Sequence, residues 1–256
     1  MSAQAPAAPM ARPRPPFAPY HKGDRNLFLL LVCLTWLGIL VGFGWDIVVH
    51  VTQHKLAYPL IVHIHAAVFV GWMVLLTTQV LLIRARKPAV HKRLGLGMAG
   101  LAAIMVPLGL YASWVSERGY HGTPDFDASF YIVPIGGMLA FAVLIAAGFL
   151  LRADSAAHKR LMLLSTIFLS AAGFSRWWGF MVGNALGTGF WAFFTDLNVG
   201  PNLIILILGG YDLVTRGRLH PAFVWGAAWL VVIEFAEAWL YFNPTWQALA
   251  LKIAGY

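Results

Sequence analysis

Residues 58–97 read YPLIVHIHAAVFVGWMVLLTTQVLLIRARKPAVHKRLGLG: an apolar run, a short basic hinge and the start of a second apolar run. The first run, Tyr58–Ile83, has 26 residues and contains no Asp, Glu, Lys or Arg. A helix of that length crosses the ~30 Å hydrocarbon core of a bilayer. The second half of the pattern recurs in residues 148–173, GFLLRADSAAHKRLMLLSTIFLSAAG. The chain is therefore predicted to be an all-α membrane protein with an internal two-helix hairpin repeat.

The composition supports a membrane location for the chain. Hydrophobic residues make up 60% of it and charged residues 11%, whereas about a quarter of a soluble domain is charged. The net charge of +8 does not indicate nucleic-acid binding, because the basic residues cluster in short loops between apolar runs. Cys33 is the single cysteine, which excludes an intramolecular disulfide and a cysteine metal cage. Glycines such as Gly42 and Gly136 are expected to allow close helix contact.

Hydropathy predicts one seven-span domain over residues 26–256, preceded by a disordered, basic and Pro-rich cytosolic tail, residues 1–25. Pro201 is expected in a first turn and Pro134 at a kink in the fourth span. Residues 184–196, NALGTGFWAFFTD, are expected to form an interfacial loop. The predicted spans are Asn26–His50, Tyr58–Ile83, Leu94–Ser116, Ala128–Arg152, Leu161–Gly183, Leu197–Val214 and Pro221–Phe242.

The distribution of basic residues predicts the orientation of the spans. Four lie before the first span, five between the second and third, three after the fourth and two after the sixth, which places 14 of 18 on one side. Because cytosolic loops are enriched in Lys and Arg, the N-terminus is predicted to be cytosolic and the C-terminus periplasmic. This arrangement predicts a multi-pass protein of the bacterial inner membrane whose main partner is the lipid bilayer.

Ionisable residues within spans are the first candidates for function, because they are costly in a bilayer. Counting about 1.5 Å per residue from the cytosolic side places Glu234, Arg176 and His63 all roughly 20–22 Å up, in the outer half of the membrane. The predicted outer site consists of His63, His65, His50, Asp46, Glu234 and Glu237, with Arg176 as the charge partner. His63 and His65 are two residues apart and point to different sides of a helix, so only one is expected to face the interior.

Three interpretations of this outer layer remain open from spacing alone. Imidazole and carboxylate groups are good ligands for zinc, iron or copper, and two imidazoles could hold a haem iron. Alternatively, Arg176 and a carboxylate form an ion pair that only fixes the packing of the helices. In the third interpretation the same groups line a path for protons or ions.

A second candidate site lies on the predicted cytosolic side. His91 and His158 each begin an HKRL motif, His220 precedes the seventh span, and Asp212 ends the sixth. Lys and Arg at this level are explained by orientation and by contact with anionic lipids. Three histidines at equivalent depth are less well explained in that way, because lipid contact accepts Lys or Arg equally well.

The HKRL motifs at 91–94 and 158–161, together with His63 or His65, resemble a group of uncharacterised bacterial multi-span membrane proteins with repeated His-Lys/Arg-x-Leu hairpins. The resemblance covers about residues 58–183. The chain is also loosely similar to b-type cytochromes and haem-handling membrane proteins, which implies haem held by histidines of neighbouring helices. No GxSxG, P-loop or HExxH motif is present, and the seventh span has no lysine for a retinal Schiff base.

The leading hypothesis from the sequence is a redox or metal-binding membrane protein, with haem or a transition metal (Fe, Zn or Cu) as the expected cofactor. The alternatives are a proton- or ion-coupled transporter and an accessory subunit that acts with other membrane proteins and has no site of its own.

Overall fold

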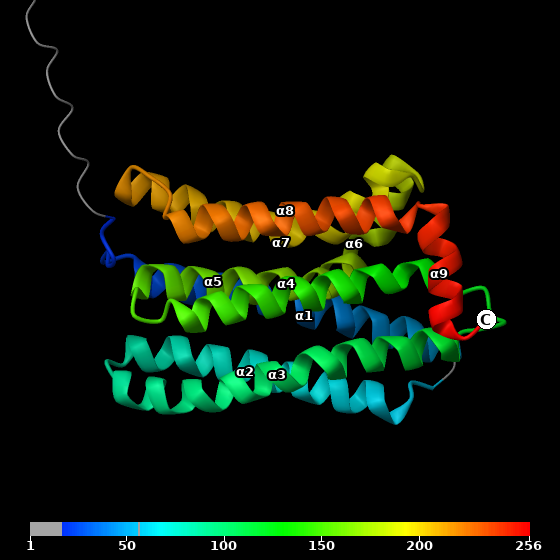
Figure 1. Ribbon diagram of the computed structural model, residues 1–256, viewed down its shortest axis with the longest axis horizontal. Coiled ribbons are helices and arrows are strands. Elements are labelled where there is room, and N and C mark those ends of the chain that lie inside the picture. Colours follow the sequence, from blue (N-terminus) through cyan, green and yellow to red (C-terminus); the bar gives the residue numbers. More distant parts are fainter. Residues whose placement is uncertain (1–16, 56) are drawn as a thin grey trace, which may run out of the picture.

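The computed structural model describes residues 17–55 and 57–256 (Figure 1). Throughout these ranges the regular structure is helical, which confirms the all-α prediction. The elements are α1 (Asp24–Thr52), α2 (Leu60–Arg84), α3 (Pro88–Gly119), the short 3₁₀ helix η1 (Ala128–Tyr131), α4 (Ile132–Leu150), α5 (Ser155–Leu169), α6 (Ala171–Leu186), α7 (Phe190–Arg216), α8 (Pro221–Tyr241) and α9 (Pro244–Ala254).

Six helical segments are long and apolar enough to cross a membrane: α1, α2, α3, η1 with α4, α7 and α8. They run side by side along the long axis, and α9 lies across one end (Figure 1). Their outward faces carry exposed large apolar side chains, such as Leu40, Leu206 and Val232. Because such a surface is unfavourable in water, the bundle is that of a multi-pass membrane protein whose outer faces contact lipid.

The two ends of the bundle are named here for the sides predicted for them. The inner end carries the start of α1 and the connections α2–α3, α4–α5 and α7–α8. The outer end carries the connections α1–α2, α3–η1 and α6–α7, together with α9.

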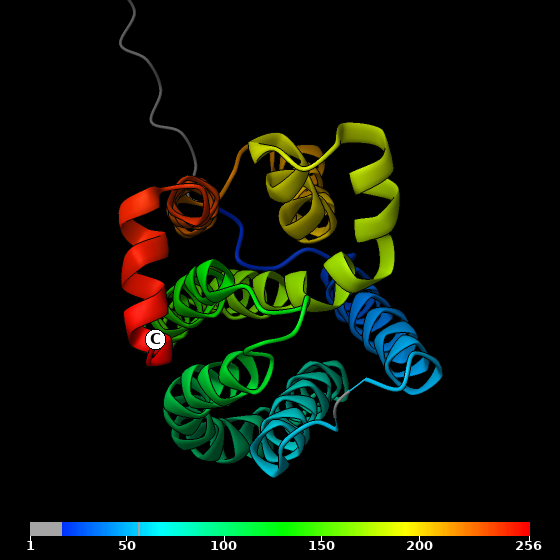
Figure 2. The same ribbon diagram turned by 90° about the vertical axis from the view of Figure 1, so that its right-hand side faces the viewer.

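Helix α5 lies at the centre of the bundle. Eleven of its 15 residues are buried, including Leu164 and Ile167 at 0% exposure. It packs against α1, α4, α7 and α8, and the end-on view shows α4 and α5 between the α2–α3 pair and the α7–α8 pair (Figure 2). Its buried residues include the polar Arg160, Ser165 and Thr166, so protein and not lipid encloses this helix.

The predicted fifth span, Leu161–Gly183, is divided between α5 and α6, which meet at Ser170. The Ser170 hydroxyl donates a hydrogen bond to Ile167 O at 2.5 Å, within the last turn of α5. Neither half reaches the length of a span, so six candidate spans are found where seven were predicted. The break turns α6 toward α1, where Gly173 packs directly on Gly42 and leaves no room for a Cβ on either residue.

The region around the predicted sixth span also differs from the prediction. The predicted interfacial loop 184–196 is wrong except for residues 187–189, because residues 184–186 end α6 and residues 190–196 form the first two turns of α7. Helix α7 is therefore 27 residues long, and Pro201 lies in its interior and not in a first turn. Pro134 lies in the first turn of α4, where its missing N–H costs no helical hydrogen bond.

The predicted N-terminal tail, residues 1–25, lies mostly outside the described residues. Its described part packs on the inner end of the bundle: Arg216 Nε donates to Ala18 O at 2.9 Å, and Lys159 Nζ donates to Pro19 O at 2.8 Å. The ring of Phe17 lies 4.7 Å from the guanidinium of Arg160. Residues 17–23 thus form a strap over the inner end before α1 begins.

Candidate functional site

Two carboxylates are buried together between α4, α7 and α8. Glu234 and Glu237 are 1% and 3% exposed. Glu234 Oε2 accepts a hydrogen bond from Asn202 Nδ2 of α7 at 3.1 Å, whereas Oε1 of each glutamate is buried without a partner in the described structure. Gly136 of α4 makes room for Glu237, because a Cβ at that position would collide with Glu237 Oε1.

The local sequence explains how the two helices present these groups. Glu234 and Glu237 are three residues apart and lie on one face of α8, and Asn198 and Asn202 are four apart on one face of α7. Asn198 is 1% exposed, and neither its side-chain nitrogen nor its oxygen has a partner among the described residues. We call Asn198, Asn202, Glu234 and Glu237 the acid–amide cluster.

Unpartnered polar atoms in a protein interior are uncommon and indicate a water, a proton or a ligand. The acid–amide cluster has four: one oxygen of each glutamate and both polar atoms of Asn198. None of the ion pairs of the described chain involves either glutamate. The cluster therefore has the capacity to take up positive charge.

The other predicted outer residues lie on α1, α2 and α6. Asp46 Oδ2 accepts a hydrogen bond from Tyr58 OH at 2.7 Å, and Asp46 Oδ1 lies 3.5 Å from Arg176 Nε. The ring of His50 stacks on Tyr58 at 4.1 Å between centroids. Asp46, His50 and Tyr58 border a cavity of about 180 Å³, which Lys55, Tyr120 and Asp125 also line. Burial and the hydrogen bond to Asp46 raise the pKa of Tyr58, so this phenol stays protonated.

The two histidines of α2 have different surroundings. His63 is exposed, with its ring edge toward Tyr58. His65 is partly buried against Phe69, with 4.0 Å between ring centroids, and its Nδ1 has no partner in the described structure. His65 is therefore the one that faces the interior.

The structure does not bring the predicted outer residues together into one site. Helix α2 packs on α1 and α3, whereas α8 packs on α4, α5 and α7. The end-on view shows α2 and α8 on opposite sides of the α4–α5 pair (Figure 2). Arg176 consequently pairs with Asp46 and not with Glu234 or Glu237. Among residues 17–55 and 57–256, no group of three or more His, Cys, Asp or Glu side chains is placed to hold a metal ion.

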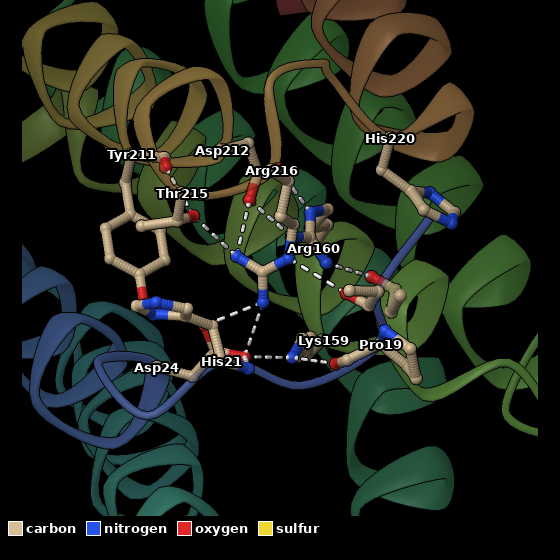
Figure 3. A network of polar contacts seen from close by, with 12 residues as sticks. Pro19, His21, Asp24, Lys159, Arg160, Tyr211, Asp212, Thr215, Arg216 and His220 are labelled. Carbon is tan, nitrogen blue, oxygen red and sulfur yellow. Dashed lines mark hydrogen bonds and ion pairs between the residues drawn. The ribbon is translucent and has the colours of Figure 1, made fainter. Parts of the chain in front are cut away.

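The inner end contains a network of ion pairs (Figure 3). Arg160 and Asp212, both at 0% exposure, form a bidentate pair with distances of 2.6 and 2.5 Å. Arg216 contacts Asp212 at 3.3 Å and both oxygens of Asp24 at 2.8 Å. Lys159 completes the set with a 2.7 Å contact to Asp24. We call Asp24, Lys159, Arg160, Asp212 and Arg216 the inner-end network.

Of the four predicted inner residues, the structure places Asp212 inside this network. His220 lies beside it, with Nε2 3.5 Å from Asp154 and Nδ1 accepting the N–H of Ala222 at the start of α8. Burial holds the pKa of His220 below its usual value. His91 and His158, from the two HKRL motifs, face each other with perpendicular rings 6.2 Å apart.

Sequence reasoning missed Arg160, Asp24 and the two asparagines. Arg160 was assigned to the loops that set orientation, although it lies in the central helix. Counting residues along the helix from the end of α4 places Arg160 inside the bundle, at the same depth as Asp212. The asparagines carry no charge, so the criterion of ionisable residues within spans does not select them.

The fold and the acid–amide cluster define the protein as an integral membrane helical bundle with a buried acidic site. No protein-family model, curated protein or solved structure matches the chain.

Proposed function

We propose that the protein is a proton-coupled membrane transporter that binds protons at Glu234 and Glu237. The observation that supports this proposal is the burial of two adjacent carboxyl groups without any cationic partner in the described structure. A buried carboxylate is stable only when it is protonated, paired or bound to a cation. Asn202 supplies one hydrogen bond and no charge.

The energies favour proton uptake by the pair. Side chains three residues apart on a helix lie about 5–6 Å from each other, and two unit charges at that distance repel by about 3 kcal/mol at an effective dielectric constant of about 20. Desolvation adds several kcal/mol for each ion. One proton shared by the pair, or one on each carboxyl group, removes most of this cost, as in other carboxyl pairs that share a site.

A broken helix and a proline-containing helix beside the cluster support transport in preference to a purely structural role. Transporters commonly bind their substrates and coupling ions near the middle of the membrane, where helices are broken. Gly200 and Pro201 lie between the two asparagines of the cluster on α7, and Phe174 of the broken α5–α6 segment packs against Gly200. A site bordered by such helices can change shape at a lower cost than one bordered by regular helices.

The metal or haem interpretation has no comparable support, because His63 and His65 of α2 lie on the opposite side of the α4–α5 pair from the buried carboxylates of α8. The interpretation as an accessory subunit without a site of its own does not explain why Glu234 and Glu237 have buried oxygens without a hydrogen-bond partner.

The proposal includes a topology. In it α5 and α6 cross the membrane together as one broken helix, giving seven crossings, with the N-terminus in the cytosol and the C-terminus in the periplasm of a bacterial inner membrane. The positive-inside distribution supports this orientation. Helix α5 begins at the inner end and α6 finishes at the outer end, as a single crossing requires (Figure 1).

Infrared difference spectroscopy of the protein in lipid nanodiscs tests the proton site. Protonated carboxyl groups have a C=O stretch that carboxylates lack, so the wild type should show this band at neutral pH. The band should weaken in Glu234→Gln and in Glu237→Gln and lose most of its amplitude in the double variant, where the partly buried Glu117 carboxyl group accounts for the remainder. Asp125→Asn, which alters an exposed carboxylate paired with Lys55, is the matched control and should leave the band unchanged.

Transport itself is measured with liposomes that contain the protein and a pH-sensitive dye. After external acidification, the lumen should acidify faster with the wild type than with Glu237→Gln. A wild type without the carboxyl band, or a double variant that keeps most of it, contradicts the proposal.

A further inference from the structure

Helix α8 continues the face of the glutamate pair toward the outer end. Tyr241 lies four residues after Glu237 and seven after Glu234, so the three side chains follow one face of the helix. The Tyr241 hydroxyl donates a hydrogen bond to Asp127 Oδ2 at 2.5 Å. The ring of Tyr241 is fixed by stacking on Phe193, with 4.0 Å between centroids.

Asp127 links this tyrosine to the outer surface. It lies in the connection between α3 and η1 and is partly exposed. Its Oδ1 caps η1 by accepting the N–H of Ser129 at 3.0 Å, and its own N–H donates to Glu117 Oε1 at 2.7 Å. A carboxylate held in this way at the surface can take a proton from water and pass it to the tyrosine hydroxyl.

The opposite direction is closed by apolar side chains. One turn before Glu234 on α8 is Leu230, at 1% exposure, and Gly226 beyond it packs on Leu164 of the central helix. On α7, Leu208 lies between Asn202 and the inner end, and it is 0% exposed. The next ionisable group is Asp212, whose oxygens are already bonded to Arg160.

We infer that protons reach the acid–amide cluster from the outer end, with Asp127 as the entry group and Tyr241 as the relay. This inference rests on the proposed function, because it concerns protons bound at Glu234 and Glu237. In the transfer, protonated Asp127 gives its proton to the Tyr241 oxygen while the Tyr241 hydroxyl, rotated toward Glu237, gives its proton to that carboxylate. Tyr241 is unchanged at the end, and Asp127 regains a proton from the outer water.

The rate at which the buried carboxyl protons exchange with solvent tests this route. In nanodiscs transferred rapidly to D₂O, the C=O band of the glutamate pair shifts as O–H becomes O–D. Tyr241→Phe keeps the aromatic ring and removes the relay, so the band should retain its amplitude while exchange slows by roughly tenfold or more. Tyr131→Phe is the matched control, because its outer-end hydroxyl bonds only to the Leu110 carbonyl in the described structure.

The variant Asp127→Asn distinguishes a proton-carrying role of Asp127 from a purely structural one. Asparagine can still cap η1 and accept the tyrosine hydrogen bond, but it cannot carry a proton. The inference expects slow exchange in this variant, whereas a purely structural role expects the wild-type rate. Wild-type exchange in both Tyr241→Phe and Asp127→Asn overturns the route and leaves the proton site standing. Absence of the band in the wild type instead overturns the proposed function.

Discussion

Replacing Asp212 by Asn should strongly destabilise the inner end of the bundle. Arg160 donates two charge-assisted hydrogen bonds to Asp212, and both side chains are at 0% exposure. Asparagine has nearly the shape of aspartate but no charge, so the Arg160 cation remains buried without a counter-ion. Stranding one partner of a buried ion pair costs about 3–5 kcal/mol. Within the described residues, the other hydrogen bond of Arg160 goes to the Ala156 carbonyl at 2.8 Å, which supplies no charge.

A double-mutant cycle isolates the interaction energy between Arg160 and Asp212 from the energies of their other contacts. Arg160→Met should cost less than Asp212→Asn, because Asp212 keeps its 3.3 Å contact with Arg216 as a counter-ion. The double variant Arg160→Met with Asp212→Leu should cost less than the sum of the single changes, since no buried charge is left unpaired.

Unfolding in mixed lipid–detergent micelles with increasing SDS, followed by tryptophan fluorescence, measures these differences. The exposed pair Lys55–Asp125 is the control, and Asp125→Asn should change the free energy of unfolding by about 1 kcal/mol or less. If Asp212→Asn also remains within about 1 kcal/mol of the wild type, the argument that this pair stabilises the inner end is refuted.

Three further predictions concern the packing at Gly136, the topology of α5 and α6, and the protonation of His220. Gly136→Ala should displace Glu237 and cost about 1–3 kcal/mol of stability, measured in the same micelles, because a Cβ there collides with Oε1. Reporter fusions after Ala156 and Thr188 should read cytosolic and periplasmic, and the same side for both contradicts a crossing by α5 and α6. Below about pH 6.5 the protection factors of the amide hydrogens at the start of α8 should fall, because burial lowers the pKa of His220 and its neutral form is the one that stabilises the fold. This dependence on pH should disappear in His220→Asn, which keeps the N-cap acceptor.

Hydropathy was sufficient to predict the helical membrane class and the approximate positions of most spans, because apolar length is a local property. The break at Ser170 was not predictable in this way, since residues 161–183 are apolar on both sides of it. The depth count assumed a straight helix from Leu161 and therefore placed Arg176 level with Glu234. In the structure α6 turns toward α1, and Arg176 lies beside Asp46.

The burial of Glu234 and Glu237 was predictable, and their neighbours were not. Depth along a span follows from counting residues, but the choice of neighbouring helix depends on side-chain packing across the whole bundle. Here Gly136 admits Glu237 against α4, and Asn202 meets Glu234 from α7. The predicted partner His63 lies on a helix that packs elsewhere.

On the proposed function, the two ends of the bundle differ in what must change when each opens during a transport cycle. At the outer end Tyr241 bonds to Asp127, and on the inferred route this pair leads to a cluster with unpartnered oxygens. At the inner end the buried charges of Arg160 and Asp212 hold α5 and α7 together. Opening the inner end is least costly if water reaches both charges at once, because neither ion is then left buried alone. On the proposed function, the inward-open state therefore requires α7 to move away from α5 with both ions hydrated, and Asp212→Asn should shift the protein toward that state while lowering its stability.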